Sequence, residues 1–340
     1  MNKDSPHTIR LLTALWALSE SGLGGIMHAF KIPFTGFFLG GFAIIIITLI
    51  AHYSSNRFTT IVQATVLVIL VKATASPHSP PMAYIAVAFQ GFIGALIFQM
   101  GFNKIIAILF GGIALLESAI QKFLTATLLF GKSIWEALDG MVNGIAKDLS
   151  LSSDFSFSFW LMGIYTGVYV VWGIVVGAWS FGLPKKIETD ARSTLMAYAQ
   201  LNTIKLNNQL EQPKKHKGRK ILSIVFILIF IVFVFLVQDG IPRATYAILR
   251  TIAALLLLYF IITPISKYLF SKWLNSSKQK HKSNLQQIVD LIPSLKNRVH
   301  PAMQLAKQSH SGILVYRQFV VNLIVLGLYS EQNRIGKSSN

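Results

Sequence analysis

The chain has 340 residues, of which 53% are hydrophobic and 13% are charged. A soluble domain carries about a quarter charged residues, so this composition excludes an ordinary soluble protein and predicts an integral membrane protein. The absence of cysteine excludes disulfides, iron–sulfur clusters and thiolate zinc sites.

The formal net charge is +18, and most of it lies in the second half of the chain. Residues 1–182 contain 9 Lys or Arg against 7 Asp or Glu, whereas residues 183–340 contain 22 against 6. Lys and Arg collect in cytoplasmic segments, where they also meet anionic lipid headgroups. No aromatic–basic binding module accompanies the charge, so we expect contact with membrane lipid and no nucleic-acid partner.

Apolar segments long enough to cross a bilayer, about 20 residues each, recur along the chain. Six lie in the first half, and two more follow a polar linker. The expected spans are 9–27, 34–51, 58–75, 82–100, 105–129, 157–180, 221–238 and 244–265. We therefore predict an all-α integral membrane protein: a six-helix transmembrane bundle with a C-terminal helical hairpin and amphipathic cytoplasmic helices.

The basic residues of the loops predict the orientation. The linker 183–220 and the segment 266–282 are rich in Lys and Arg and are expected in the cytoplasm. Counting back through six spans places the N-terminus in the cytoplasm too, and the loops 28–33, 76–81 and 130–156 outside. The prediction is a multi-pass protein of the cell inner or plasma membrane.

This pattern divides the chain into four regions. They are a six-helix membrane domain (1–182), a basic cytoplasmic linker (183–220), a two-helix transmembrane hairpin (221–265) and a basic, partly amphipathic helical region (266–340).

The C-terminal region contains two further helical patterns. Residues 285–292 have apolar residues at the spacing of an amphipathic helix, which we expect to stop near Pro293. Residues 312–329 are apolar but contain Arg317, Gln318 and Asn322. Both a ninth span and a helix lying in or under the membrane are compatible with this segment.

The first outer loop combines glycines with charged side chains. Glu20, His28 and Lys31 place a carboxylate, an imidazole and an ammonium close together, and glycines between them bend or break the helix. Backbone opened in this way must find partners in protein or water. We expect either a re-entrant loop that closes over a polar ligand or an interfacial loop with a snorkelling lysine.

The second outer loop contains Ser76, His78 and Ser79. Ser79 is expected to cap the next helix, with Pro80 at its first position, where a missing N–H is harmless. Helix N-termini attract anionic groups, and transporters use helix ends in this way. The loop is therefore either part of a binding site or a stiff turn, and both can hold together.

Polar residues also occur inside the predicted spans. Gln90 lies near mid-membrane, and Glu117 and Gln121 share a helix face. An ionisable group at this depth indicates function by default, although a structural Glu117–Lys122 contact is the alternative. Residues 134–145 form an amphipathic pattern typical of either a lid helix or a helix packed on the membrane surface.

Sequence signatures of catalysis are missing. The sequence Gly131-Lys132-Ser133 lacks the earlier glycine of a phosphate-binding loop, because that position holds Ala126. The histidines lack metal-ligand spacing. We expect no enzyme activity, no metal and no cofactor.

Two stretches resemble a known family. They are G-L-G-G-I-M-H-A-F-K-I-P-F-T-G-F-F-L-G-G (22–41) and S-P-H-S-P-P-M-A-Y-I-A-V-A-F-Q-G (76–91). Together with the six predicted spans they resemble the substrate-binding S component of an energy-coupling factor (ECF) transporter, over about residues 9–182. The resemblance implies uptake of a vitamin or precursor, held by the first, third and fifth loops.

The family also implies partners. A stripe of small residues on the first helix docks on a transmembrane coupling subunit, and Thr13, Ala17 and Ser21 are a loose version of it. Separate ATPase subunits hydrolyse ATP. The second half departs from the family and looks like a reduced coupling subunit fused to the first.

Three functions follow as hypotheses. The first is a substrate-binding or transport subunit for a small polar nutrient. The second is a membrane scaffold that recruits a partner or anionic lipid through the basic half, and the third is an intramembrane enzyme using Glu20/His28 or Glu117/Lys122. The expected binding residues are Glu20, His28, Lys31, Ser76, His78, Ser79, Gln90, Glu117 and Gln121.

Overall fold

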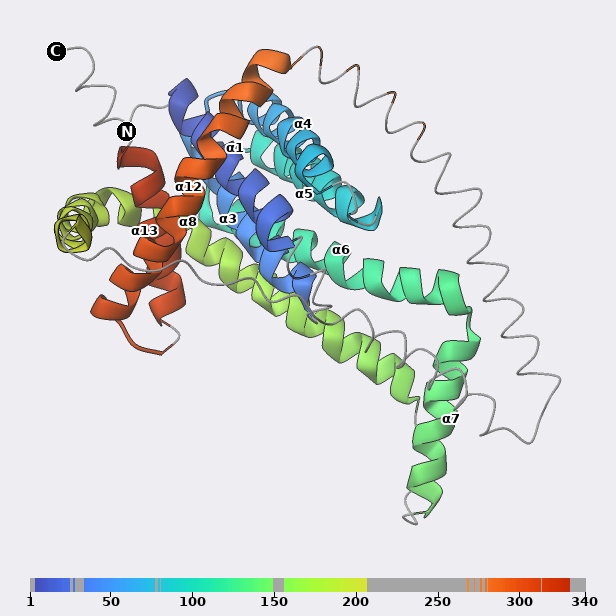
Figure 1. The fold of residues 1–340 in the computed structure, drawn as a ribbon. Coiled ribbons are helices and arrows are strands. Elements are labelled where there is room, and N and C mark those ends of the chain that lie inside the picture. Colours follow the sequence, from blue (N-terminus) through green and yellow to red (C-terminus); the bar gives the residue numbers. More distant parts are fainter. Residues whose placement is uncertain are drawn as a thin grey trace, which may run out of the picture. The chain divides into compact units, whose positions relative to one another are not determined.

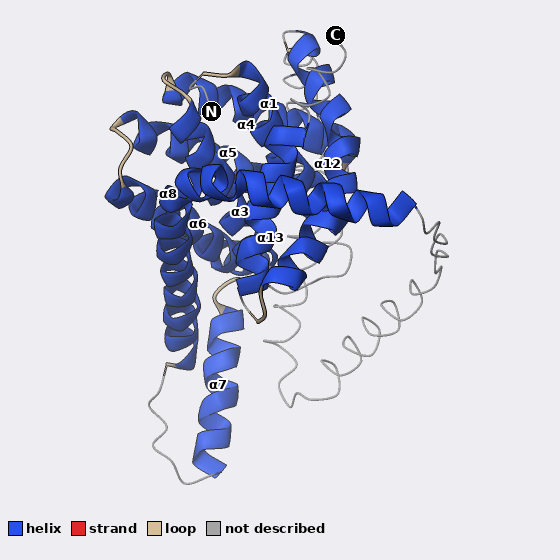
Figure 2. Ribbon diagram, turned by 90° about the vertical axis from the view of Figure 1, so that its left-hand side faces the viewer, coloured by secondary structure: helices blue, strands red, loops and turns tan. Residues whose placement is uncertain are grey.

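The computed structural model describes residues 4–24, 27, 34–76, 79, 81–148, 156–206, 281–312 and 314–330, with single positions at 268, 272, 276 and 279. All the regular elements in this part of the chain are helices (Figures 1 and 2). In chain order they are α1 (Pro6–Leu18), the π-helical turn η1 (Ser19–Leu23), α3 (Thr35–Tyr53), α4 (Arg57–Ala75), α5 (Pro81–Gln99), α6 (Lys104–Phe130), α7 (Ser133–Asp148), α8 (Phe157–Leu206), α12 (Lys282–Ser309) and α13 (Leu314–Ser330).

Five of the described helices are long and apolar enough to cross a membrane, namely α3, α4, α5, α6 and α8. They correspond to the second to sixth predicted spans and support the predicted helical membrane protein. The first predicted span, 9–27, is a shorter α-helix that continues into a π-helical turn. The predicted spans 221–238 and 244–265 lie outside the described residues.

Helix α1 is enclosed by other helices of its own compact unit, which comprises Met1–Phe123, Phe159–Asn202 and Ser266–Asn340. It packs against α3, α4, α12 and α13 (Figure 1). Thr13 is 1% exposed and Ala17 is 0% exposed. These two residues of the small-residue stripe are therefore covered by the chain itself, and they are not free to dock on a separate coupling subunit.

Helices α6 and α8 cross at glycines. A Cβ atom added to Gly173 would lie 2.2 Å from the carbonyl oxygen of Gly111, and one added to Gly177 would lie 2.3 Å from the carbonyl oxygen of Ala107. Small residues let helix backbones approach closely in this way, which is how transmembrane helices pack when no hydrophobic effect drives them together. The crossing fixes the position of α6, which carries part of the site below.

Two helices extend past their predicted ends. Helix α8 continues through Pro184, so the expected domain boundary at residue 182 lies inside a helix. Helix α12 continues through Pro293, so the predicted stop there is wrong. The reason is packing: α12 has buried residues on both sides of Pro293, including Ile288, Leu295 and Ala302, whose spacing of seven keeps them on one face.

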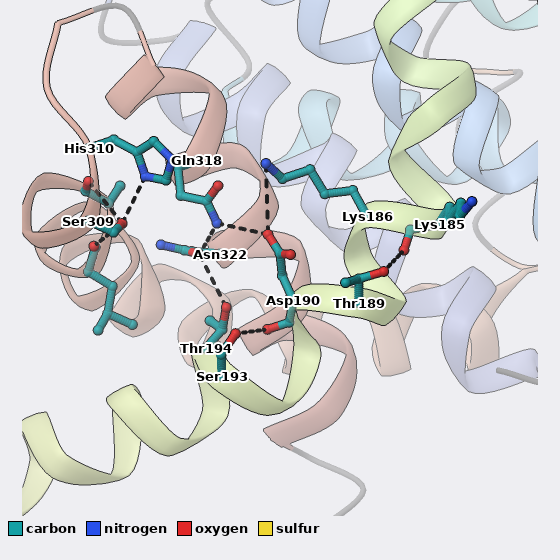
Figure 3. Close-up of polar contacts among 12 residues, drawn as sticks. Lys185, Lys186, Thr189, Asp190, Ser193, Thr194, Ser309, His310, Gln318 and Asn322 are labelled. Atoms are coloured by element: carbon teal, nitrogen blue, oxygen red, sulfur yellow. Dashed lines mark hydrogen bonds and ion pairs between the residues drawn. The ribbon is translucent and has the colours of Figure 1, made fainter.

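Polar contacts hold α13 to α8 and α12 (Figure 3). The Gln318 amide donates to the Asp190 carboxylate at 3.2 Å and to Oδ1 of Asn322 at 3.1 Å. The Asn322 amide donates to the carbonyl of Ala302 at 3.3 Å, and the Thr194 hydroxyl donates to Asn322 at 3.4 Å. Gln318 and Asn322, two of the three polar residues that left the assignment of segment 312–329 open, therefore form hydrogen bonds within the chain.

The second compact unit comprises Leu124–Ser158 and Thr203–Ile265, and α7 is its main described element. The Trp135 indole donates to the Thr127 hydroxyl at 2.9 Å. The N–H and hydroxyl of Ser158 donate to the Asp139 carboxylate at 2.6 and 2.8 Å. These hydrogen bonds hold the pKa of Asp139 below its usual value.

Candidate functional site

A cavity of about 120 Å³ is lined by residues of η1, α3, α4, α5 and α6. All of them belong to the first compact unit. Its walls combine apolar residues of α3 and α5 with a smaller set of polar side chains. These polar side chains include Glu20, Lys72, Gln90, Ser118, Gln121 and Lys122.

An ion pair forms one wall of the cavity. The Lys72 ammonium lies 2.7 Å from Oε2 of Glu20, and these residues are 1% and 3% exposed. Lys72 also donates to the carbonyl of Ala83 at 3.4 Å and lies 5.8 Å from the centroid of the Tyr84 ring. A charge removed from water is tolerated only when it is paired, so each of the two charges requires the other.

Glu20 lies in the π-helical turn that follows α1. Such turns are rare in proteins, and those that occur are often found at functional sites. The extra residue in the turn redirects the side chains that follow it. The turn continues the buried helix α1 and presents the carboxylate to the last turn of α4, where Lys72 lies. The ion pair thus joins two elements that are 52 residues apart in sequence.

Gln90 presents an unsatisfied acceptor at the cavity. It is 3% exposed, and among the described residues its Oε1 atom has no hydrogen-bond partner. An unsatisfied buried acceptor costs about 1–3 kcal/mol. Gly40 provides space for this amide, because a Cβ atom at that position would lie 3.2 Å from Nε2 of Gln90.

Helix α6 contributes the facing wall. The Gln121 amide donates to the carbonyl of Met82 at 3.0 Å, which ties α6 to the first turn of α5. Ser118 is 6% exposed and bonds the carbonyl of Ala114 in its own helix at 3.4 Å. Lys122 is exposed and adds a cation at the edge of the cavity.

The structure brings together three of the nine predicted binding residues: Glu20, Gln90 and Gln121 line the cavity. Glu117 is not among the lining residues: the residues of α6 that line the cavity are Ser118, Gln121 and Lys122, and Glu117 lies at the edge of the face on which they centre. The Oε2 atom of Glu117 is buried and lacks a partner among the described residues.

The two predicted serines form a local turn and are not among the lining residues. The Ser79 hydroxyl donates to the Ser76 hydroxyl at 3.0 Å, and the Tyr84 hydroxyl donates to the Ser76 carbonyl at 3.2 Å. Helix α5 begins at Pro81, one residue later than predicted, so Ser79 is not adjacent to its first residue. The remaining predicted residues lie outside the described part of the chain: His28, Lys31 and His78.

Sequence reasoning missed Lys72 and Ser118. A signal for Lys72 exists, because it is a lone cation in an otherwise apolar span and such a residue needs a partner. Glu20 is the lone carboxylate of the first predicted span, so pairing the two was within reach of the sequence. No pattern distinguishes Ser118, since serine is common in transmembrane helices.

No family model, curated protein or solved structure matches the chain. The resemblance to ECF S components therefore depends on the stretches 22–41 and 76–91 together with the number of predicted spans.

The site combines a mutually neutralised ion pair, a free amide acceptor and a cation at the edge. Its volume of about 120 Å³ is below the roughly 300 Å³ at which pockets for drug-sized ligands begin. This arrangement can hold a small polar solute of a few non-hydrogen atoms.

Proposed function

We propose that the chain is the solute-binding part of a membrane uptake system, and that the cavity beside the Glu20–Lys72 pair holds the solute. The observation that supports this is the buried Oε1 atom of Gln90, which lines the cavity without a partner among the described residues. A solute that donates to this atom removes the cost of the unsatisfied acceptor.

The predicted topology supports access from outside. The end of α4 and the start of α5, which supply Lys72 and Met82 to the cavity, flank the loop 76–81. The positive-inside rule assigns that loop to the outer face. The solute would enter from the outer side and be released inward by a partner-driven movement of the helices.

The ECF resemblance extends the proposal to the system as a whole. In this proposal the chain acts as an S component for a vitamin precursor, together with a transmembrane coupling subunit and separate ATPase subunits. The small cavity favours a precursor over a complete vitamin. Because Thr13 and Ala17 are covered by the chain, the coupling subunit would bind another surface.

One observation favours the scaffold function as a second candidate. Helix α12 exposes Lys282, Lys296 and Lys307, which suit contact with anionic lipid or an acidic partner. The two functions differ in their dependence on the cavity, because a scaffold is insensitive to substitution of Gln90.

The test is recovery of a co-purified metabolite. Wild-type protein, Gln90→Leu and the matched control Gln63→Leu, at an exposed position of α4, are purified in parallel and extracted for mass spectrometry. We expect a small polar metabolite to accompany the wild type and Gln63→Leu but not Gln90→Leu. Equal recovery from all three proteins, or enrichment in none, would contradict the proposal.

A further inference from the structure

The charges of the cavity indicate the overall charge of its ligand. Glu20 and Lys72 neutralise each other, and both are almost fully buried. Any net charge added beside them would be removed from water without a compensating partner, which is costly. The buried part of the site therefore favours a solute with no net charge.

The hydrogen-bonding groups indicate two different ends. Oε1 of Gln90 requires a donor, and the Glu20 carboxylate, which lines the same cavity, also accepts hydrogen bonds. On the same wall, paired with Glu20, the Lys72 ammonium has three N–H donors, of which Glu20 and Ala83 engage two. Lys122 supplies further donors at the edge. The solute must donate at one end and accept at the other.

The adjacent opposite charges of Glu20 and Lys72 favour a solute whose two ends are ionised over one whose ends are neutral. An ammonium next to Glu20 and Gln90, and a carboxylate next to Lys72 and Lys122, would form charge-assisted hydrogen bonds, which are roughly twice as strong as neutral ones. A molecule with both groups is neutral overall, as the buried ion pair requires.

The size of the cavity limits the rest of the molecule. At about 120 Å³ it accommodates the two charged groups and little more, and its apolar wall includes Leu39, Ala86 and Val87. Building on the proposed function, we infer that the solute is a small zwitterion of the α-amino-acid type, with a short side chain.

Binding of four small probes to the purified full-length protein tests this inference. Alanine has both charged ends, propionate lacks the ammonium, ethylamine lacks the carboxylate, and propionamide is neutral. We expect alanine to raise the thermal unfolding midpoint in detergent, and the other three to leave it unchanged. Phenylalanine, which is too large for the cavity, should also have no effect.

Two variants connect this binding to the site. Gln90→Leu removes an unsatisfied acceptor, so it should fold, and we expect it to weaken alanine binding by about tenfold or more. Lys122→Gln, at an exposed position, should weaken it as well, whereas the matched control Lys104→Gln at the start of α6 should not.

The outcomes separate this inference from the proposed function. Propionate or propionamide binding as tightly as alanine would overturn the zwitterion. The zwitterion would also be overturned if none of the probes binds although Gln90→Leu still loses a co-purified metabolite. In that case the proposed binding function would stand. If no probe binds and no metabolite depends on Gln90, both proposals are wrong.

Discussion

At the scale of single residues, Glu20 and Lys72 are the most demanding pair in the described structure. Both are surrounded by apolar helices, and their 2.7 Å contact is the reason that either can be buried. A buried ion pair is weak evidence for stability, since apolar residues of the same size often do as well. In the proposed function, the role of this pair is to bind the solute in the adjacent cavity.

Substitution of one partner tests how strongly the two charges depend on each other. Lys72→Met leaves the Glu20 carboxylate buried without its cation, and we expect the free energy of unfolding to fall by about 3–5 kcal/mol. Adding Glu20→Gln should restore part of that loss. Unfolding by SDS titration in mixed micelles measures the stability of the single and the double variant, with Lys104→Met as the control at an exposed position. A double variant as unstable as Lys72→Met alone would show that the charges do not interact.

Asp139 makes a pH-dependent contact outside the predicted spans. Its folded pKa is lowered by hydrogen bonds from Ser158, so the contact is at full strength above the unfolded value of about 3.9 and is lost as pH falls through the folded value. We expect the Ser158 amide to be protected from hydrogen exchange at pH 6 and much less so near pH 2, after correction for intrinsic rates. Asp139→Asn should show no such change, and equal protection of the wild type at both values would contradict this.

At the scale of elements, the apolar helices were predictable and their contacts were not. The second to sixth spans follow from the length and apolarity of their segments, and the structure has a helix at each. The continuation of α12 through Pro293 was not predictable, because an internal proline normally costs about 3 kcal/mol. That cost is offset by the packing of its buried face on α13 and on α1, and α1 is distant in sequence.

The crossing of α6 and α8 gives a direct test of the helix packing. Gly173→Ala would place a methyl group 2.2 Å from a carbonyl oxygen of the other backbone, so the helices must separate and the protein should be destabilised. Gly167→Ala, on the same helix, meets nothing within 4 Å and should be neutral. The thermal unfolding midpoints of the two variants provide the comparison, and equal values would exclude this crossing.

The Asn322 amide connects α13 to both α12 and α8. Asn322→Leu leaves the carbonyl of Ala302 and the amide of Gln318 without this partner, and we expect a loss of about 1–3 kcal/mol in unfolding free energy. Gln308→Leu, which lies exposed beside the same cluster, is the control and should change little. An Asn322→Leu protein as stable as the wild type would indicate that these hydrogen bonds contribute nothing.

At the scale of the whole molecule, the sequence predicted three of the residues that line the cavity but not the full set. Gln90 and Gln121 were predicted because polar residues in apolar spans require partners, and Glu20 was predicted because the first outer loop combines glycines with charged side chains. Ser118 lines the cavity and Glu117 does not because of the rotation of α6 about its own axis. The glycine crossing with α8 constrains that rotation. The small residues of that crossing, Ala107 and Gly111 on α6 and Gly173 and Gly177 on α8, are visible in the sequence, but nothing in the sequence shows that they face each other.

The proposed function requires that the cavity opens to the outer face, and cysteine accessibility in intact cells tests this requirement most directly. The chain has no cysteine, so a single introduced thiol gives an unambiguous signal. Ala83→Cys lies in the cavity wall, and Gln99→Cys lies exposed at the other end of the same helix. We predict that a membrane-impermeant thiol reagent labels Ala83→Cys in intact cells and labels Gln99→Cys only after permeabilisation. Labelling in the reverse order would contradict an outward-facing solute site.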